Sequence, residues 1–213
     1  NLRAIEANTA TNPCGEQPLP PYGCCDLGPV ILTRFVRHPF GHGGLPAFDF
    51  VAFAESVALQ VRALDNVLDL THWPLPEQAR EAQAKRRIGV GFTGLGNALT
   101  LLGLRYDAPE GRAMAARIAE AMRDAAYGAS VALAQEKGAF PALDVATYLE
   151  AGTFASRLPA ELQQAIRTHG IRNSHLLSIA PTGTVSLAFA DNASNGIEPA
   201  FSWTYTRKKR EAD

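Results

Sequence analysis

The stretch NPCGEQPLPPYGCCDLG, residues 12–28, decides how the rest of this chain is interpreted. Its start places an amide (Asn12), a thiol (Cys14) and a carboxylate (Glu16) at alternate positions. Alternate side chains of an extended backbone share one face, and the proline and glycine between these three favour a loop over a sheet ladder. The pattern therefore predicts an extended loop that presents the three groups together, although a surface turn with a small buried thiol would also fit.

The carboxylate that follows Cys14 favours one of two thiol chemistries. A thiolate nucleophile needs a nearby cation or histidine, whereas Glu16 would oppose the negative charge and no histidine lies near in the sequence. A sulfur radical that abstracts hydrogen can instead use a carboxylate as the base for a substrate hydroxyl. The residue types therefore favour radical chemistry at Cys14.

The three cysteines, at positions 14, 24 and 25, are an odd number bunched near one end of the chain. This arrangement is a poor framework for structural disulfides, so we expect working thiols. The adjacent Cys24 and Cys25 lack the spacing of a zinc site, and no histidine pair lies close to them, so we predict no metal. A redox pair made of these two neighbours would close a strained ring, which counts against a thiol-redox protein.

The composition bounds the class of protein. With 213 residues, 46% of them apolar, the chain can bury a substantial core as one domain or a large part of one. A net charge of −1 gives no general attraction for nucleic acid or an acidic membrane. The longest weakly polar stretch, residues 90–104, is too short for a bilayer span, and no leader is recognisable. We expect a cytoplasmic protein without nucleic-acid or membrane partners.

The spacing of apolar residues predicts a mixed α/β chain with far more helix than strand. A long helix is expected to begin at a proline and to stop before Gly138, as helices commonly do. Strands are expected at 26–32 and 175–180, and helices at 48–70, 77–87, 92–102, 109–137, 143–151 and 159–169.

A glycine pattern at residues 89–94, GVGFTG, matches the GxGxxG of dinucleotide-binding proteins. That motif must follow a buried strand and precede an acidic residue by about twenty positions, and both features are missing here. We interpret RRIGVGFTGLG, residues 86–96, as the start of a buried helix whose glycines permit close packing.

A second motif follows the apolar run HLLSIA, residues 175–180. It reads PTGTVS over residues 181–186, and NGIEP follows at 195–199. A turn rich in glycine and hydroxyl groups after a strand can direct several N–H groups and hydroxyls at one anion. Threonine and serine also simply cap helices, so both interpretations stay open on the residues alone.

The two motifs, in this order, resemble the active-site segments of ribonucleotide reductases. The resemblance implies that Cys14 carries a thiyl radical that takes hydrogen from the ribose 3′ carbon, and that Glu16 is the base for the 3′ hydroxyl. It implies that Asn12 hydrogen-bonds the substrate, and that Cys25 is one of two thiols that form a disulfide as the 2′ hydroxyl leaves; Cys24 has no counterpart. The substrate phosphates would be held by Pro181, Thr182, Gly183, Thr184 and Ser186.

The resemblance also implies a fold and a cofactor. The chain would be a fragment, the helix-rich C-terminal half of a ten-stranded α/β barrel, with an active-site cysteine loop region (1–45), a mainly helical part (46–170) and a phosphate-binding segment (171–213). The loop between Cys14 and Cys25 is short, like that of the adenosylcobalamin-dependent reductases. The implied partners are a ribonucleoside di- or triphosphate, a thioredoxin-like or glutaredoxin-like reductant and a second copy of the chain.

Two alternatives remain from the sequence. One is the large subunit of a reductase that uses a di-metal partner, and the other is a non-catalytic module that binds nucleotide or phosphate. The resemblance implies an upstream thiol that partners Cys25 and C-terminal thiols that re-reduce the pair, so the fragment alone is expected to be inactive. An open half-barrel would also leave strand edges unpaired.

Overall fold

The computed structural model describes the whole chain except residues 190–193, 203, 205, 207 and 209–213. The expected phosphate-binding segment, 171–213, therefore lies partly outside the described residues. None of the described helices is long and apolar enough to cross a membrane.

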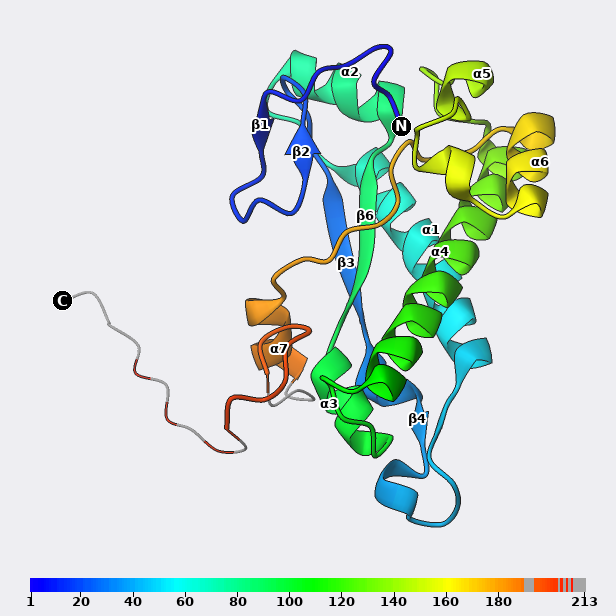
Figure 1. Cartoon of the computed structure of the whole chain (residues 1–213). Helices are drawn as coiled ribbons and strands as arrows, with labels where there is room; N and C mark the ends of the chain where they lie inside the picture. Colours follow the sequence, from blue (N-terminus) through cyan, green and yellow to red (C-terminus); the bar gives the residue numbers. More distant parts are fainter. Residues whose placement is uncertain (190–193, 203, 205, 207, 209–213) are drawn as a thin grey trace.

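Two parallel strands form the centre of the fold (Figure 1). Strand β3 (Asp26–Ile31) pairs with β6 (Ile88–Thr93) in a register that aligns Asp26 with Ile88. The expected strand at 175–180 runs beside β6 on its other edge, but only Leu177 forms a bridge, with Val90. Backbone hydrogen bonds from Ile88 N to His175 O (3.0 Å) and from Ser178 N to Val90 O (3.0 Å) hold it there. β6 is therefore the middle one of three parallel extended segments.

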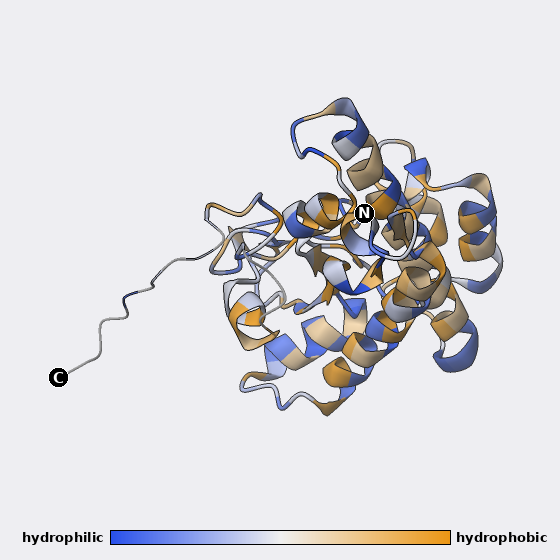
Figure 2. Ribbon diagram, turned by 90° about the horizontal axis from the view of Figure 1, so that it is seen from below, coloured by the Kyte–Doolittle hydropathy of each residue, from blue (hydrophilic) through white to orange (hydrophobic). Residues whose placement is uncertain are grey.

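Helices cover one side of these strands. Figure 1 shows α1 crossing behind β3 and β6, with α4 packed along α1, and Figure 2 shows the hydrophilic turns of the outer helices facing outward. The helices are α1 (Phe50–Leu70), α2 (Pro76–Lys85), α3 (Leu95–Leu101), α4 (Pro109–Lys137), α5 (Val145–Tyr148), α6 (Ala160–His169) and α7 (Gly183–Phe189). The shorter pieces are β1 (Ala10–Thr11), β2 (Pro18–Leu19), β4 (Val36–Arg37), β5 (Ala47–Phe48) and three 3₁₀ turns, Leu32–Phe35, Pro39–Gly41 and Ala155–Arg157.

The long helices follow from their sequence signals. The Asp49 side chain accepts a hydrogen bond from Ala52 N (3.2 Å) and caps α1, which therefore begins two residues after the expected start. Helix α4 has the expected bounds, with Pro109 at its first position and Gly138 at its C-cap at φ 87°. The helix expected at 143–151 is only the single turn α5, whose N-cap is Asp144.

The glycine-rich segment is a strand, so its interpretation as the start of a buried helix was wrong. All six residues of β6 are buried, and the large and small ones alternate. The aligned Val90 and Gly28 face α1, where a Cβ on Gly28 would lie 1.9 Å from Gln60 Nε2. The opposite face carries Gly89 and Gly91, because backbone and side chains of neighbouring segments come too close for any larger residue. The helix starts only at Leu95, after Gly94 at φ 77°.

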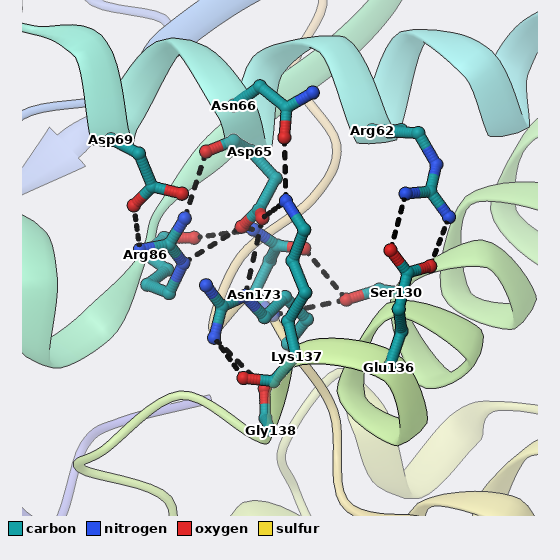
Figure 3. Close-up of polar contacts among 11 residues, drawn as sticks. Arg62, Asp65, Asn66, Asp69, Arg86, Ser130, Glu136, Lys137, Gly138 and Asn173 are labelled. Atoms are coloured by element: carbon teal, nitrogen blue, oxygen red, sulfur yellow. Dashed lines mark hydrogen bonds and ion pairs between the residues drawn. The ribbon is translucent and has the colours of Figure 1, made fainter.

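A buried ionic cluster links helix α1 to the residues just before β6 and to those just before the segment at 175–178 (Figure 3). Asp65 of α1 is fully buried and accepts hydrogen bonds from Arg86 Nε (2.8 Å), Asn173 Nδ2 (3.1 Å) and Arg172 Nε (3.2 Å). Burial alone would raise the pKa of Asp65, but the hydrogen bond and charge of Arg86, together with Arg172, lower it. The cluster therefore ties α1 to the start of β6 and to the start of the segment at 175–178.

Candidate active site

The cysteine loop is a hairpin loop closed by its own hydrogen bonds. Strands β1 and β2 pair antiparallel on either side of it. Gln17 N donates to Asn12 Oδ1 (3.0 Å), Asn12 N donates to Gln17 O (3.1 Å), and Gly15 N donates to Asn12 O (3.1 Å) with φ 83° at Gly15. The expectation of an extended backbone was wrong here, because these bonds fold residues 12–15 into a tight turn.

The turn gives Cys14 and Glu16 different surroundings. The Cys14 side chain is exposed at the tip of the loop, whereas Glu16 is half-buried. Ser178 Oγ donates to the Glu16 backbone carbonyl (3.4 Å), which ties the loop to the segment beside β6. Glu16 Oε2 is buried without a hydrogen-bond partner among the described residues, so this oxygen can accept a proton or hydrogen bond from a ligand.

Cys14 and Glu16 share a pocket with the second motif. The pocket has a volume of about 310 Å³. Its lining comprises Cys14, Glu16, Leu27, Pro29, Ala180, Pro181, Thr182, Gly183, Thr184 and Val185. Two segments at opposite ends of the chain thus meet at one cavity. Asn12 and Ser186 are not among the lining residues.

The hydroxyl groups of the second motif differ in what they contact. The Thr182 hydroxyl lies 2.9 Å from Thr93 Oγ1 and 3.0 Å from Asn195 O, and Ser186 Oγ donates to Gly183 O (2.8 Å). These two side chains are buried and stabilise the turn. Thr184 is exposed, and it lies in the first turn of α7, where backbone N–H groups have no acceptor within the helix.

Cys24 and Cys25 lie just before β3, outside the lining of the Cys14 pocket. Burial raises the pKa of Cys25 to about 12, against the opposing charge of Arg87, and burial raises the pKa of Cys24 to about 11. Both groups are therefore neutral thiols at pH 7. A Cβ on Gly89 would lie 3.3 Å from Cys25 Sγ, so the sulfur packs on the glycine face of β6.

Several pocket residues were not expected from the sequence. Leu27, Pro29 and Val185 line the cavity with apolar surface, and Ser178 anchors the loop. The strict alternation of large residues with glycine in β6 was a usable signal, since it is a strand pattern whose small face leaves room for another segment.

The described residues form a mixed α/β fold in which a thiol and a carboxylate share a pocket with a hydroxyl-rich turn. The chain belongs to the ribonucleotide reductase family, because residues 1–213 match the family described as ribonucleotide reductase, barrel domain. No closed barrel is formed by the described part of the chain.

The individual proteins that this chain resembles are also ribonucleotide reductases. The chain is 37% identical over 198 residues to the vitamin B12-dependent ribonucleoside-diphosphate reductase of Mycobacterium tuberculosis strain H37Rv, covering 93% of this chain and 24% of that protein. The enzyme of the same name from Thermoplasma acidophilum is 32% identical over 207 residues, covering 97% and 23%. The ribonucleoside-diphosphate reductase subunit alpha of Treponema pallidum is 36% identical over 191 residues, covering 87% and 21%. The chain thus spans about a quarter of the length of the curated relatives it matches.

Proposed function

We propose that this chain is part of the catalytic barrel of an enzyme that reduces ribonucleoside diphosphates to deoxyribonucleotides by thiyl-radical chemistry. The observation that carries the proposal is the shared pocket, in which Cys14 and Glu16 face residues 181–184. A single nucleotide can then contact the thiol with its ribose and the turn with its phosphates. The names of the relatives support a diphosphate as the substrate.

The side chains take different parts in this reaction. Cys14, as a thiyl radical, removes the hydrogen atom from the ribose 3′ carbon, and the unpartnered Oε2 of Glu16 accepts the proton of the 3′ hydroxyl. Asn12 Oδ1 is occupied by Gln17 N, which leaves its amide N–H groups to donate to the substrate. As the 2′ hydroxyl leaves as water, Cys25 and a thiol from outside this chain supply two electrons and become a disulfide.

The turn at residues 181–186 holds the substrate phosphates. Gly183 and Thr184, at the start of α7, line the pocket, while the buried Thr182 and Ser186 hydroxyls fix the conformation of the turn. Anchoring the phosphates there positions the ribose over the sulfur, which raises the effective concentration of the reacting atoms.

We also propose adenosylcobalamin as the cofactor of the whole enzyme. The names of relatives from two organisms support this choice, as does the interval of only ten residues between Cys14 and Cys25. The surroundings of Cys14 fit an outside radical source, because its side chain is exposed and a Cβ on the adjacent Gly15 would meet nothing within 4 Å. When bound, the cofactor would supply radical chemistry, and the Cys14 thiol is the group of this chain that would give up its hydrogen atom. No residue of this chain is assigned to the corrin.

The remaining partners follow from the same chemistry. A disulfide that includes Cys25 must be reduced after each turnover, and a thioredoxin-like or glutaredoxin-like dithiol protein is the proposed reductant. We further propose that the enzyme is a cytoplasmic homodimer.

The test is deoxyribonucleotide formation by the purified full-length enzyme from a ribonucleoside diphosphate and a dithiol reductant. Product should form with adenosylcobalamin and not without it. Turnover without the cofactor, supported by an iron- or manganese-loaded second subunit, would overturn the cofactor assignment. Nucleotide binding without product under both conditions would overturn the enzymatic function in favour of a binding module.

A further inference from the structure

Cys25 and Arg87 occupy neighbouring positions at the start of the two parallel strands. Asp26 is aligned with Ile88 in the register of β3 and β6, so continuing it by one residue aligns Cys25 with Arg87. Aligned residues of adjacent parallel strands point to the same face. Gly89 lies on that face two residues after Arg87, and a Cβ there would lie 3.3 Å from Cys25 Sγ. The two side chains therefore leave the strands on the glycine face of β6, and the charge of Arg87 acts on the Cys25 sulfur.

Arg87 is a buried cation with a hydrogen-bond donor left over. It is 3% exposed, and its Nη2 donates to Glu6 Oε1 (2.6 Å). Glu6 is shared with Lys85, whose Nζ lies 2.8 Å from Glu6 Oε2 and which also pairs with Glu81. Arg87 Nε has no partner among the described residues. A buried donor without an acceptor is unfavourable, and a negative charge on the neighbouring sulfur would relieve it.

We propose that Arg87 is a positioning residue that stabilises the thiolate of Cys25 when the disulfide formed during turnover is opened. The proposal rests on the proposed function, in which Cys25 is one of the two redox thiols. Arg87 touches neither substrate nor radical; it acts through the sulfur of Cys25.

The step that it assists is thiol–disulfide exchange with the dithiol that reduces the pair. A thiolate of the reductant attacks the sulfur of the partner cysteine, the S–S bond breaks, and its electron pair remains on Cys25 as a thiolate beside Arg87. The second thiolate of the reductant then attacks the mixed disulfide, releases the partner cysteine and leaves the reductant as a disulfide. Cys25 and its partner take up protons, so the enzyme gains the two electrons that the reductant loses.

The other groups around Cys25 oppose its ionisation, so Arg87 is needed to stabilise the thiolate. Burial raises the pKa of Cys25, Arg87 acts to lower it, and Asp26, Cys24 and Glu16 act to raise it further. Arg87 is thus the only cation among the groups that shift this pKa. A thiolate leaves faster when its pKa is lower, so the exchange would slow without the guanidinium.

The experiment measures the alkylation rate of Cys25 at pH 9 in the reduced full-length enzyme. Iodoacetamide is the reagent, and a background of Cys14→Ser with Cys24→Ser leaves Cys25 as the only thiol in the tryptic peptide of residues 4–34, which mass spectrometry quantifies. Arg87→Gln should slow alkylation about tenfold, the effect of one pKa unit. Arg87→Lys should keep the rate within about threefold because the charge remains.

Controls separate electrostatics from loosened structure. Loosening would expose Cys25 and speed its alkylation, which is the opposite of the expected result. Arg62→Gln removes an exposed cation of another ion pair and should leave the rate unchanged. Glu6→Gln removes the anion that pairs with Arg87, so it should speed alkylation while the thermal midpoint is kept, and it tests the proposal even if Arg87→Gln fails to fold. A faster rate that appears only with a lowered midpoint would be loosening and would count against the proposal.

An unchanged or faster rate in Arg87→Gln would overturn the role of Arg87, and so would an unchanged or slower rate in Glu6→Gln. The role of Cys25 itself is tested separately, by turnover of Cys25→Ser with the dithiol reductant. Sustained turnover of that variant would overturn the redox assignment of Cys25, whatever the alkylation rates are.

Discussion

The backbone of Ser178 lies directly against Gly91, where a Cβ would come within 2.0 Å of the Ser178 carbonyl oxygen. This contact holds the third extended segment against β6. The same segment anchors the cysteine loop through Ser178 Oγ and continues into the pocket wall at Ala180 and Pro181. A glycine in the strand thus determines where the two halves of the candidate site meet.

The first prediction concerns this glycine. Gly91→Ala should destabilise the full-length enzyme by about 3 kcal/mol, because the methyl group collides with backbone that cannot rotate away. Gly128→Ala is the matched control: Gly128 lies inside α4, and its Cβ would have Leu162 Cδ2 at 4.0 Å as its nearest neighbour. That change should raise stability by up to ~1 kcal/mol. Equal thermal midpoints for the two variants would contradict the packing described here.

The second prediction concerns the buried cluster of Figure 3. Asp65→Ala should cost about 3–5 kcal/mol of unfolding free energy, because it leaves the buried Arg86 with only the half-exposed Asp69 and removes the carboxylate that pairs with Arg172. Glu136→Ala removes an exposed partner of Arg62 and should change stability little, since exposed ion pairs contribute weakly. Denaturant unfolding of both variants is the measurement. Similar losses of unfolding free energy in the two variants would show that burial does not make the Asp65 ion pairs stronger than the exposed one.

The third prediction is the pH dependence of the same group. The folded-state pKa of Asp65 is lowered, so its contribution to stability is fully present above the unfolded-state value of about 3.9. That contribution is lost as the pH falls through the lower, folded-state pKa. The stability difference between the unmodified enzyme and Asp65→Asn should therefore be constant from about pH 5 to 7 and shrink below about pH 4. A stability difference that grows as the pH falls would contradict the lowered folded-state pKa of Asp65.

The fourth prediction separates binding from folding in the phosphate turn. Thr184→Ala should raise the KM for the nucleotide about tenfold without changing the thermal midpoint, because Thr184 lines the pocket and its side chain is exposed. Thr182→Ala should lower the thermal midpoint, since its hydroxyl contacts Thr93 and Asn195 inside the fold. If Thr184→Ala left the KM unchanged, Thr184 would have no part in phosphate binding.

Much of the helical scaffold was predictable because its signals are local. The bounds of α4 follow from Pro109 and Gly138, and the apolar stripe of α1 predicts its end at Leu70. Its start was predicted two residues early because the capping Asp49 was overlooked. Asp65 was missed, although it lies four positions after Val61 on the same helix face, and a carboxylate in an apolar stripe signals a buried partner.

The errors arose where distant contacts decide the backbone. Residues 88–93 are a short apolar run, which by composition alone suits a buried helix or a buried strand. Pairing with β3 and the segment at 175–178 fixes them as a strand, which the alternation with glycine had indicated. Residues 12–16 alternate as an extended loop would, but hydrogen bonds between Asn12 and Gln17 close them into a turn. The proximity of Cys14 to residues 181–184 followed from the family resemblance and could not be derived from local sequence.

The most direct test of the account compares Cys14→Ser with Cys24→Ser in the full-length enzyme, by deoxyribonucleotide formation from a ribonucleoside diphosphate. Both changes replace one sulfur by oxygen in the same loop region, but only Cys14 lines the pocket with Glu16. We predict that Cys14→Ser abolishes product formation while its thermal midpoint is retained, and that Cys24→Ser keeps ordinary turnover. Ordinary turnover of Cys14→Ser would contradict the assignment of the radical to this residue.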